Sequence, residues 1–205
     1  MTPPRPTPSH RRGAAVRQAV LEATTELLAT EGLEGTRIAD IAARAGVHET
    51  SVYRRWGTRS KLILEALSHR LDSELPRPDT GSTHEDLTTF FTALAAFLAT
   101  PTGRALARIA LDPQDDDTQA AQLRGRFWTD RLDRAGHLVR RGIERGDLPR
   151  ETDPEFLLEA LAGPLHLRVL QRGQPTGRDH VRRLVDLVLA GARSALPENH
   201  ECHGT

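Results

Sequence analysis

Residues 49–61 carry the main candidates in this chain for contacts to nucleic acid. They hold a carboxylate, hydroxyls, a phenol and several cations: Glu49, Thr50, Ser51, Tyr53, Arg54, Arg55, Arg59 and Lys61. Guanidinium and hydroxyl groups bind phosphate oxygens, and arginine also pairs with the edge of guanine. Glu49 can accept a hydrogen bond from a cytosine amine, or stabilise a helix N-terminus through the helix dipole. Aromatic residues are unusual on a solvated face, so Tyr53 beside two arginines favours a DNA-contacting surface.

Residues 36–56 have the pattern of two short helices joined by a tight turn, which would position these side chains. Apolar residues recur at helical spacing in the first helix, and Thr36 stands where an N-cap is expected. Gly46 occupies the turn, where glycine tolerates a left-handed backbone. The residues expected to pack the two helices together are Ile41, Ala42, Gly46, Val47, Val52 and Trp56. This packing leaves the polar residues of the second helix outside, as entry into the major groove requires. An ordinary helical hairpin is the alternative.

The same residues resemble the N-terminal DNA-binding domain of the TetR family of transcriptional regulators. The motif is Thr36-x-x-x-x-Ile41-Ala42-x-x-x-Gly46-Val47-x-x-x-x-Val52-Tyr53-Arg54-x-Trp56, and the resemblance extends over about residues 14–74. Trp56 stands where the family more often has phenylalanine, and His48 stands where serine or threonine is common. The resemblance implies that the DNA-binding residues are Arg37, His48, Glu49, Thr50, Ser51, Tyr53, Arg54, Arg55 and Arg59.

The chain beyond the turn at 76–82 also has helical periodicity, and no segment alternates like a strand. We therefore expect an all-α fold of about nine helices, with an N-terminal three-helix helix-turn-helix domain joined to a larger helical C-terminal domain. Pro164 should kink the helix that contains it. The expected domains are a disordered basic Pro-rich arm at 1–13, the DNA-binding domain at 14–74, an effector-binding and dimerisation domain at 75–196, and a disordered tail at 197–205.

Composition and charge agree with a chain of which one part touches phosphate. The 205 residues have no net formal charge, and 38% of them are hydrophobic, so a packed core is expected. Residues 1–64 hold ten Arg or Lys against six Asp or Glu, whereas the remaining residues hold 18 against 22. No apolar run reaches the roughly 18 residues needed to span a bilayer. The single cysteine, Cys202, excludes an intramolecular disulfide. These features predict a cytoplasmic protein with a basic, DNA-binding N-terminal part.

The last two expected helices, 153–172 and 178–195, carry more apolar surface than one neighbour would cover. Such a surplus predicts a four-helix contact between two subunits. The residues expected at this dimer interface are Phe156, Leu161, Leu165, Leu184, Leu187, Val188 and Gly191. A monomeric core filled by the same residues is the alternative. A two-fold dimer would place its recognition helices in successive major grooves, about 34 Å apart.

Side chains in the helical body are candidates for a small-molecule pocket, with core packing as the alternative role for each. They are Phe90, Leu94, Phe97, Trp128 and His166. No Walker loop, HExxH, GxSxG or dinucleotide-binding fingerprint occurs, so we expect neither catalysis nor a cofactor. His200, Cys202 and His203 have no fourth ligand nearby in the sequence, so we expect no metal site.

These patterns together predict a homodimeric, sequence-specific transcriptional regulator that represses from a palindromic operator. A small effector would tilt the helix expected at 58–75, change the spacing of the recognition helices and release the DNA. Two alternatives remain, namely an architectural protein that binds DNA without sequence preference, and an enzyme-like ligand-binding body fused to a helix-turn-helix. The neutral net charge disfavours the first, and the missing catalytic motifs disfavour the second.

Overall fold

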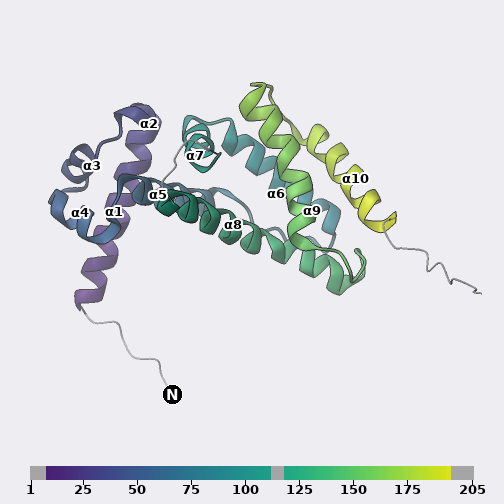
Figure 1. The fold of residues 1–205 in the computed structure, drawn as a ribbon. Helices are drawn as coiled ribbons and strands as arrows, with labels where there is room; N and C mark the ends of the chain where they lie inside the picture. The colour runs from purple at the N-terminus through teal and green to yellow at the C-terminus, as the bar shows by residue number, and fades with distance from the viewer. Residues whose placement is uncertain (1–7, 112–117, 195–205) are drawn as a thin grey trace, which may run out of the picture. The chain divides into compact units, whose positions relative to one another are not determined.

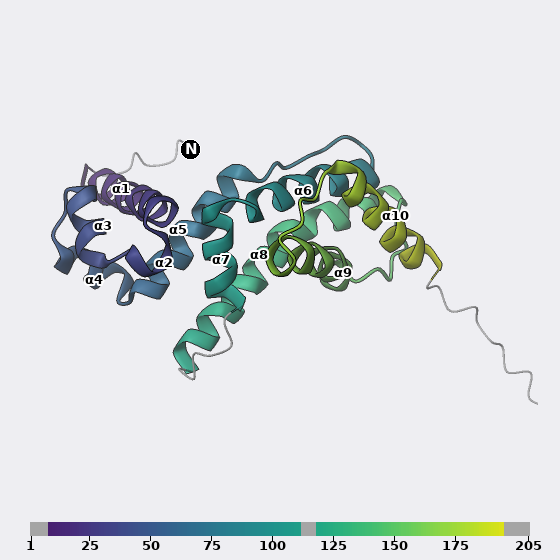
Figure 2. The ribbon, with the colours of Figure 1, turned by 90° about the horizontal axis from the view of Figure 1, so that it is seen from above.

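The structure is a computed structural model that describes residues 8–111 and 118–194 (Figures 1 and 2). Within these ranges it contains α-helices, one π-helical segment and no strand, so the all-α prediction is confirmed. The elements are α1 (Pro8–Thr30), α2 (Gly32–Gly35), α3 (Ile38–Ala45), α4 (Glu49–Trp56), α5 (Arg59–Glu74), α6 (Thr83–Leu98), α7 (Pro101–Leu111), α8 (Thr118–Arg145), α9 (Pro154–His166), η1 (Leu167–Gln171) and α10 (Arg178–Ser194). The addition to the nine expected helices is α2, which at four residues is too short to show a period.

The two ends of the chain can be compared with the expected arm and tail. Helix α1 begins at Pro8 rather than at residue 14, so residues 8–13 of the expected arm are helical. Proline is favoured in the first turn of a helix, where its missing N–H has no helical partner. Residues 1–7 of the expected arm and the expected tail at 197–205, with its histidines and cysteine, lie outside the described residues.

The helices group into two compact units, one made of Met1–Glu74 with Thr100–Phe127 and the other of Leu75–Ala99 with Trp128–Thr205. The expected boundary after residue 74 is one of the divisions. However, α7 and the first part of α8 belong with the N-terminal unit, so the expected domain at 75–196 is not one compact unit. Helix α7 packs on α1 and α5, and periodicity alone does not reveal which neighbour an apolar stripe will cover.

The second unit is built around one apolar core to which α6, α8, α9 and α10 all contribute. Helix α6 contacts both α9 and α10. The most deeply buried members of this core are Leu87, Phe91, Leu138, Val139, Leu158, Leu161, Leu165, Val181 and Val185. Val185 lies on the core side of α10, which leaves the opposite side of that helix for other contacts.

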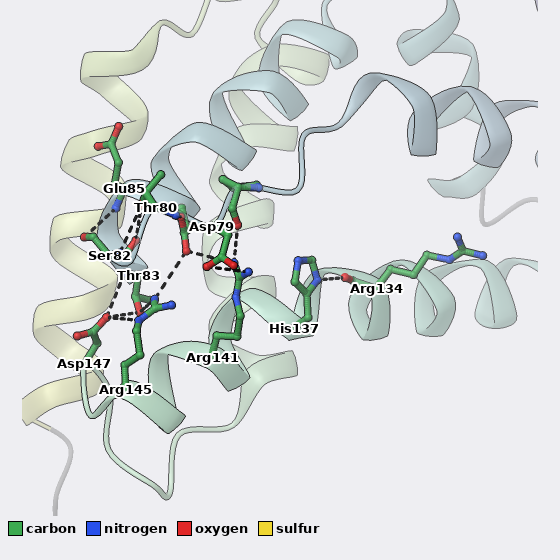
Figure 3. Close-up of polar contacts among 12 residues, drawn as sticks. Asp79, Thr80, Ser82, Thr83, Glu85, Arg134, His137, Arg141, Arg145 and Asp147 are labelled. Carbon is green, nitrogen blue, oxygen red and sulfur yellow. Dashed lines mark hydrogen bonds and ion pairs between the residues drawn. The ribbon is translucent and has the colours of Figure 1, made fainter.

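A polar network at the start of α6 joins this helix to the end of α8 (Figure 3). Thr83 donates its hydroxyl to Asp147 Oδ2 at 2.8 Å and its backbone N–H to the same oxygen at 3.2 Å. These bonds, followed by the charge of Arg145, hold the pKa of Asp147 below its usual value. The fully buried Asp86 accepts from Thr80 and from Arg141, at 2.8 and 3.2 Å. The network fixes the loop after residue 75 against α8.

Pro164 lies inside α9, where it removes one backbone donor, and the helix passes directly into the π-helical segment η1. The wider winding is visible in the bond from Arg172 N–H to Leu167 O at 3.1 Å. The expected single helix at 153–172 is therefore α9 followed by η1.

No single described helix is both long and apolar enough to cross a membrane. Among the described residues, α6 and residues 101–108 of α7 reach the length and composition of a membrane span only when they are counted together across the bend between them.

Candidate DNA-binding interface

Helices α3 and α4 form a compact pair because the chain turns sharply at Gly46. This glycine has φ 67° and ψ 34°, the left-handed conformation that suits residues without a Cβ. Behind it, the Val47 N–H donates to Ala42 O at 3.0 Å and closes the end of α3. The turn thus brings α4 back across α3 after only three residues outside the helices.

The start of α3 differs from the sequence-based expectation. Arg37, rather than Thr36, is the N-cap residue, and no side-chain cap bond forms there. Thr36 is fully buried and donates its hydroxyl to Gly32 O at 2.7 Å, one turn back. The four-residue helix α2, which the sequence did not reveal, supplies this acceptor and explains the change of role.

The inner side of the pair packs into the core of the first unit together with α1 and α5. Ile41 and Val52 are fully buried, Ala42 is 2% exposed and Trp56 is 6% exposed, while Val47 is partly buried against the same cluster. His48 is the N-cap of α4 and makes no side-chain cap bond. Helix α4 is therefore held in place by its apolar residues.

The outer side of α4 is polar and open to solvent. Tyr53 is 51% exposed, although it is a large aromatic residue. The other exposed residues of this face are His48, Glu49, Thr50, Arg54 and Arg55, and Ser51 is half-buried. The guanidinium of Arg55 lies 5.5 Å from the centre of the Trp56 ring, where the ring's π-electrons attract its charge. The expected base- and phosphate-contacting residues of α4 thus lie on one accessible face.

The two remaining predicted DNA-binding residues already have partners within the protein. Arg37 pairs with Asp40 at 2.7 Å, and this pairing lowers the pKa of Asp40, yet the Arg37 side chain is 75% exposed. Arg59 donates from Nε to Thr36 O at 2.6 Å and from its Nη2 to Leu33 O. Arg59 therefore ties the start of α5 to the α2–α3 corner, and a phosphate would have to use its other donors.

Sequence reasoning missed a bridge between α4 and its neighbours. Glu65 on α5 accepts from the Trp56 indole N–H at 2.9 Å and from Arg17 Nε of α1 at 2.7 Å. A signal for it was present in the sequence, because tryptophan in place of phenylalanine adds a donor that needs an acceptor when buried. Nothing in the spacing showed which residue would provide it.

Comparison with known proteins decides the family. Residues 20–66 match the model of the bacterial regulatory proteins of the tetR family, and residues 77–188 match the model of the tetracyclin repressor-like C-terminal domain. The chain belongs to the TetR family of transcriptional regulators. It is a DNA-binding transcriptional regulator rather than an enzyme, as its relatives' names also indicate.

Several members of the family align with this TetR protein along most of its length. It is 38% identical to the HTH-type transcriptional regulator AqdR of Rhodococcus erythropolis, over 88% of this chain and 86% of that protein. It is 30% identical to the HTH-type transcriptional regulator YdeS of Bacillus subtilis, over 89% and 92%. The solved structure of the TetR family transcription regulator SCO0332 superposes with a TM-score of 0.76 at 29% identity, covering 86% of this chain and 97% of that one.

The residues expected at a dimer interface separate into two groups in this TetR protein. Leu161 and Leu165 are fully buried in the chain's own core, so they cannot contact a partner, and this part of the prediction is wrong. Phe156 and Leu187 are 70% and 71% exposed. Leu184 and Val188 are partly buried, and Gly191 is exposed. Part of this apolar stripe therefore faces the chain's own core and part of it faces outward.

Phe156, Leu187, Val188 and Gly191 line a groove between α9 and α10. The residues that line it are mostly apolar: Pro149, Glu151, Thr152, Asp153, Phe156, Leu157, Ala160, Leu187, Val188, Gly191 and Ala192. Asp153 caps α9 by accepting from the N–H groups of Glu155 and Phe156, which fixes the end of the groove.

The side chains expected to line an effector pocket fall into a contacting pair and three core-packed residues. Trp128 and His166 meet edge to face with ring centres 5.7 Å apart. His166 Nδ1 lies 2.8 Å from Ala162 O, and burial lowers the pKa of the imidazole. Phe90 and Leu94 pack against the core of the second unit, and Phe97 is 4% exposed.

Proposed function

We propose that this TetR protein regulates transcription by inserting α4 into the major groove of a specific operator. The observation that carries the proposal is the outer face of α4, where Tyr53 and Arg54 are exposed while Val52 and Trp56 anchor the helix from behind. A rigid helix with hydroxyl, phenol and guanidinium groups on its free face matches the donors and acceptors of base edges and phosphates.

Individual roles follow from chemistry and exposure. Arg54 pairs with guanine, and Tyr53 and Thr50 contact phosphates or base edges nearby. Glu49, at the first turn of α4, accepts from a cytosine amine or stabilises the helix N-terminus. Arg37 remains accessible at 75% exposure, so a phosphate can share it with Asp40.

The active form in this proposal is a homodimer formed by α9 and α10. Phe156 and Leu187, each about 70% exposed, flank the apolar groove between these helices. Large apolar side chains around such a groove are typical of subunit contacts. The same helices of a second copy would complete a four-helix arrangement and set the distance between two copies of α4.

A small molecule bound in the second unit would act as the effector and release a repressor from a palindromic operator in the cytoplasm. The Trp128–His166 pair supports a binding role, since its aromatic surfaces suit an apolar ligand. A neutral imidazole that donates from Nδ1 to Ala162 O keeps Nε2 as an acceptor for such a ligand. Binding that favours one conformation would shift the population away from the operator-bound form.

Fluorescence anisotropy tests the proposal directly. Labelled DNA from the gene's own upstream region and random DNA of equal length are titrated with the protein at two salt concentrations. We expect tight, selective binding that saturates at two chains per palindrome. Equal affinity for both DNAs, lost in modest salt, would instead indicate non-specific phosphate binding.

A further inference from the structure

We propose that Glu65 is a positioning residue for operator recognition, which holds the C-terminal end of α4 against α5 and α1 through the Trp56 indole. This inference rests on the proposed role of α4 as the recognition helix. It adds a residue that touches no DNA and that belongs to another helix.

The carboxylate of Glu65 divides its two oxygens between two helices. Oε2 accepts from the Trp56 indole N–H at 2.9 Å, at the last residue of α4. Oε1 faces the guanidinium of Arg17 on α1, at 2.7 Å from Nε and 2.6 Å from Nη2. One side chain of α5 therefore joins α1 to the end of the recognition helix.

The Trp56 N–H needs this acceptor because the residue is only 6% exposed. A buried donor without a partner is costly, and nearly all such groups are paired in native proteins. A phenylalanine would fill part of the same space without making the bond. The hydrogen bond to Glu65 is thus an interaction that tryptophan makes at this position in addition to its apolar packing.

The chain turns sharply between the end of α4 and the start of α5. Only Gly57 and Thr58 separate α4 from α5, and Gly57 has a positive φ of 76°. The other link from α5, made by Arg59, reaches the α2–α3 corner and not α4. The Trp56–Glu65 bond is therefore a direct polar tie, within the first unit, between α5 and the end of the recognition helix.

Loss of this tie should weaken specific binding more than non-specific binding. Base reading requires side chains held within about 0.5 Å of their positions, whereas attraction to phosphate falls off slowly with distance. In a variant whose α4 can tilt about Gly57, Arg54 and Arg55 still reach the DNA phosphates. The contacts of α4 to base edges are weakened.

The test uses four single variants of the full-length chain and one double variant. Trp56→Phe removes the indole donor and keeps an aromatic ring, and Glu65→Leu removes the acceptor. Glu65→Gln keeps an acceptor oxygen for Trp56 while losing the charge. Glu74→Gln is the matched control, because it breaks an ion pair on α5 that only reaches Arg70 of the same helix.

We expect Trp56→Phe and Glu65→Leu each to weaken operator binding about tenfold, with affinity for random DNA within about twofold of wild type. The double variant should be no weaker than the weaker single variant, because both remove the same bond. Glu65→Gln should recover most of the affinity, and Glu74→Gln should behave as wild type.

A two-dimensional ¹H–¹⁵N spectrum of the two indole groups distinguishes positioning from misfolding. In Glu65→Leu the Trp56 signal, identified by its absence in Trp56→Phe, should move to the position of an indole N–H without a carboxylate acceptor. The Trp128 signal should stay in place, since Trp128 belongs to the other unit. Movement of both signals would show general unfolding of Glu65→Leu. In that case the operator affinities of Glu65→Gln and Trp56→Phe would be compared instead: the inference requires that Glu65→Gln bind more tightly than Trp56→Phe.

Three results would overturn the inference: operator affinity of Glu65→Leu within twofold of a wild type that does select its operator, additive losses in the double variant, or equal weakening on random DNA. A wild type that binds both DNAs equally would overturn the proposed function itself. The two failures are distinguished by the wild-type titration alone.

Discussion

Tyr53 and Arg54 are adjacent on the exposed face of α4, and neither contributes to the core behind it. Replacing both by alanine should weaken selective operator binding by about 10- to 1,000-fold, because a bidentate contact to a base and a phosphate contact disappear. Unfolding in urea should change by less than about 0.5 kcal/mol, as for other exposed sites. Arg172→Ala, which removes an exposed guanidinium from the second unit, is the control for charge. Unchanged anisotropy titrations of the double variant would remove these residues from the interface.

Gly142 on α8 is packed so closely that a methyl group has no room. A Cβ there would lie 2.4 Å from Thr83 Oγ1 and 2.9 Å from Thr83 Cγ2, and Thr83 is only 1% exposed. Gly142→Ala should therefore destabilise the protein by about 1–3 kcal/mol despite alanine's better helix propensity. Gly125→Ala, in an open position of the same helix, should be neutral or stabilising by up to about 1 kcal/mol. Urea unfolding of the two variants measures the difference, and equal stabilities would show that Thr83 can move aside.

At the scale of elements, α10 has a core side and an outward side. Leu187→Glu places a charge on the outward side, where the leucine is 71% exposed and lines the groove. We expect this change to shift the protein from dimer to monomer in light scattering and to weaken operator binding, since each half-site would bind separately. Circular dichroism should remain helical. Ala190→Glu, an exposed position of α10 outside the groove lining, should leave the dimer intact. A dimeric Leu187→Glu would place the subunit contact elsewhere.

Helices with a long, regular apolar period were predictable from the sequence. Short helices, and contacts that depend on which neighbour a residue meets, were not. The start and end of α10 fall within one residue of the expected 178–195, because the spacing of its apolar residues marks them directly. Helix α2 and the burial of Thr36 were missed, since one turn has no period. Leu161 and Leu165 were assigned to the wrong side because an apolar stripe does not say whether its neighbour is the same chain or another. Glu65 was missed because its two partners are 9 and 48 residues away.

At the scale of the whole molecule, a two-fold dimer imposes a fixed spacing on its operator. Inserting five base pairs between the half-sites turns one of them by about half a helical turn, to the far side of the duplex. We expect this operator to lose cooperative binding of two chains. Inserting ten base pairs returns both half-sites to the same side of the duplex, so that operator tests only the distance between them. Electrophoretic mobility shifts with the three operators measure the stoichiometry. Equal binding to all three would mean that the two half-sites are occupied independently.

The chain contains two tryptophans, and the structure places one in each compact unit. Trp56 is the last residue of α4, and Trp128 lies against His166. The fluorescence of each tryptophan can therefore be recorded alone after the other tryptophan is replaced. In a Trp128→Phe variant, ultraviolet emission would report on the environment of α4. In a Trp56→Phe variant, it would report on the proposed effector site beside His166, without any attached dye.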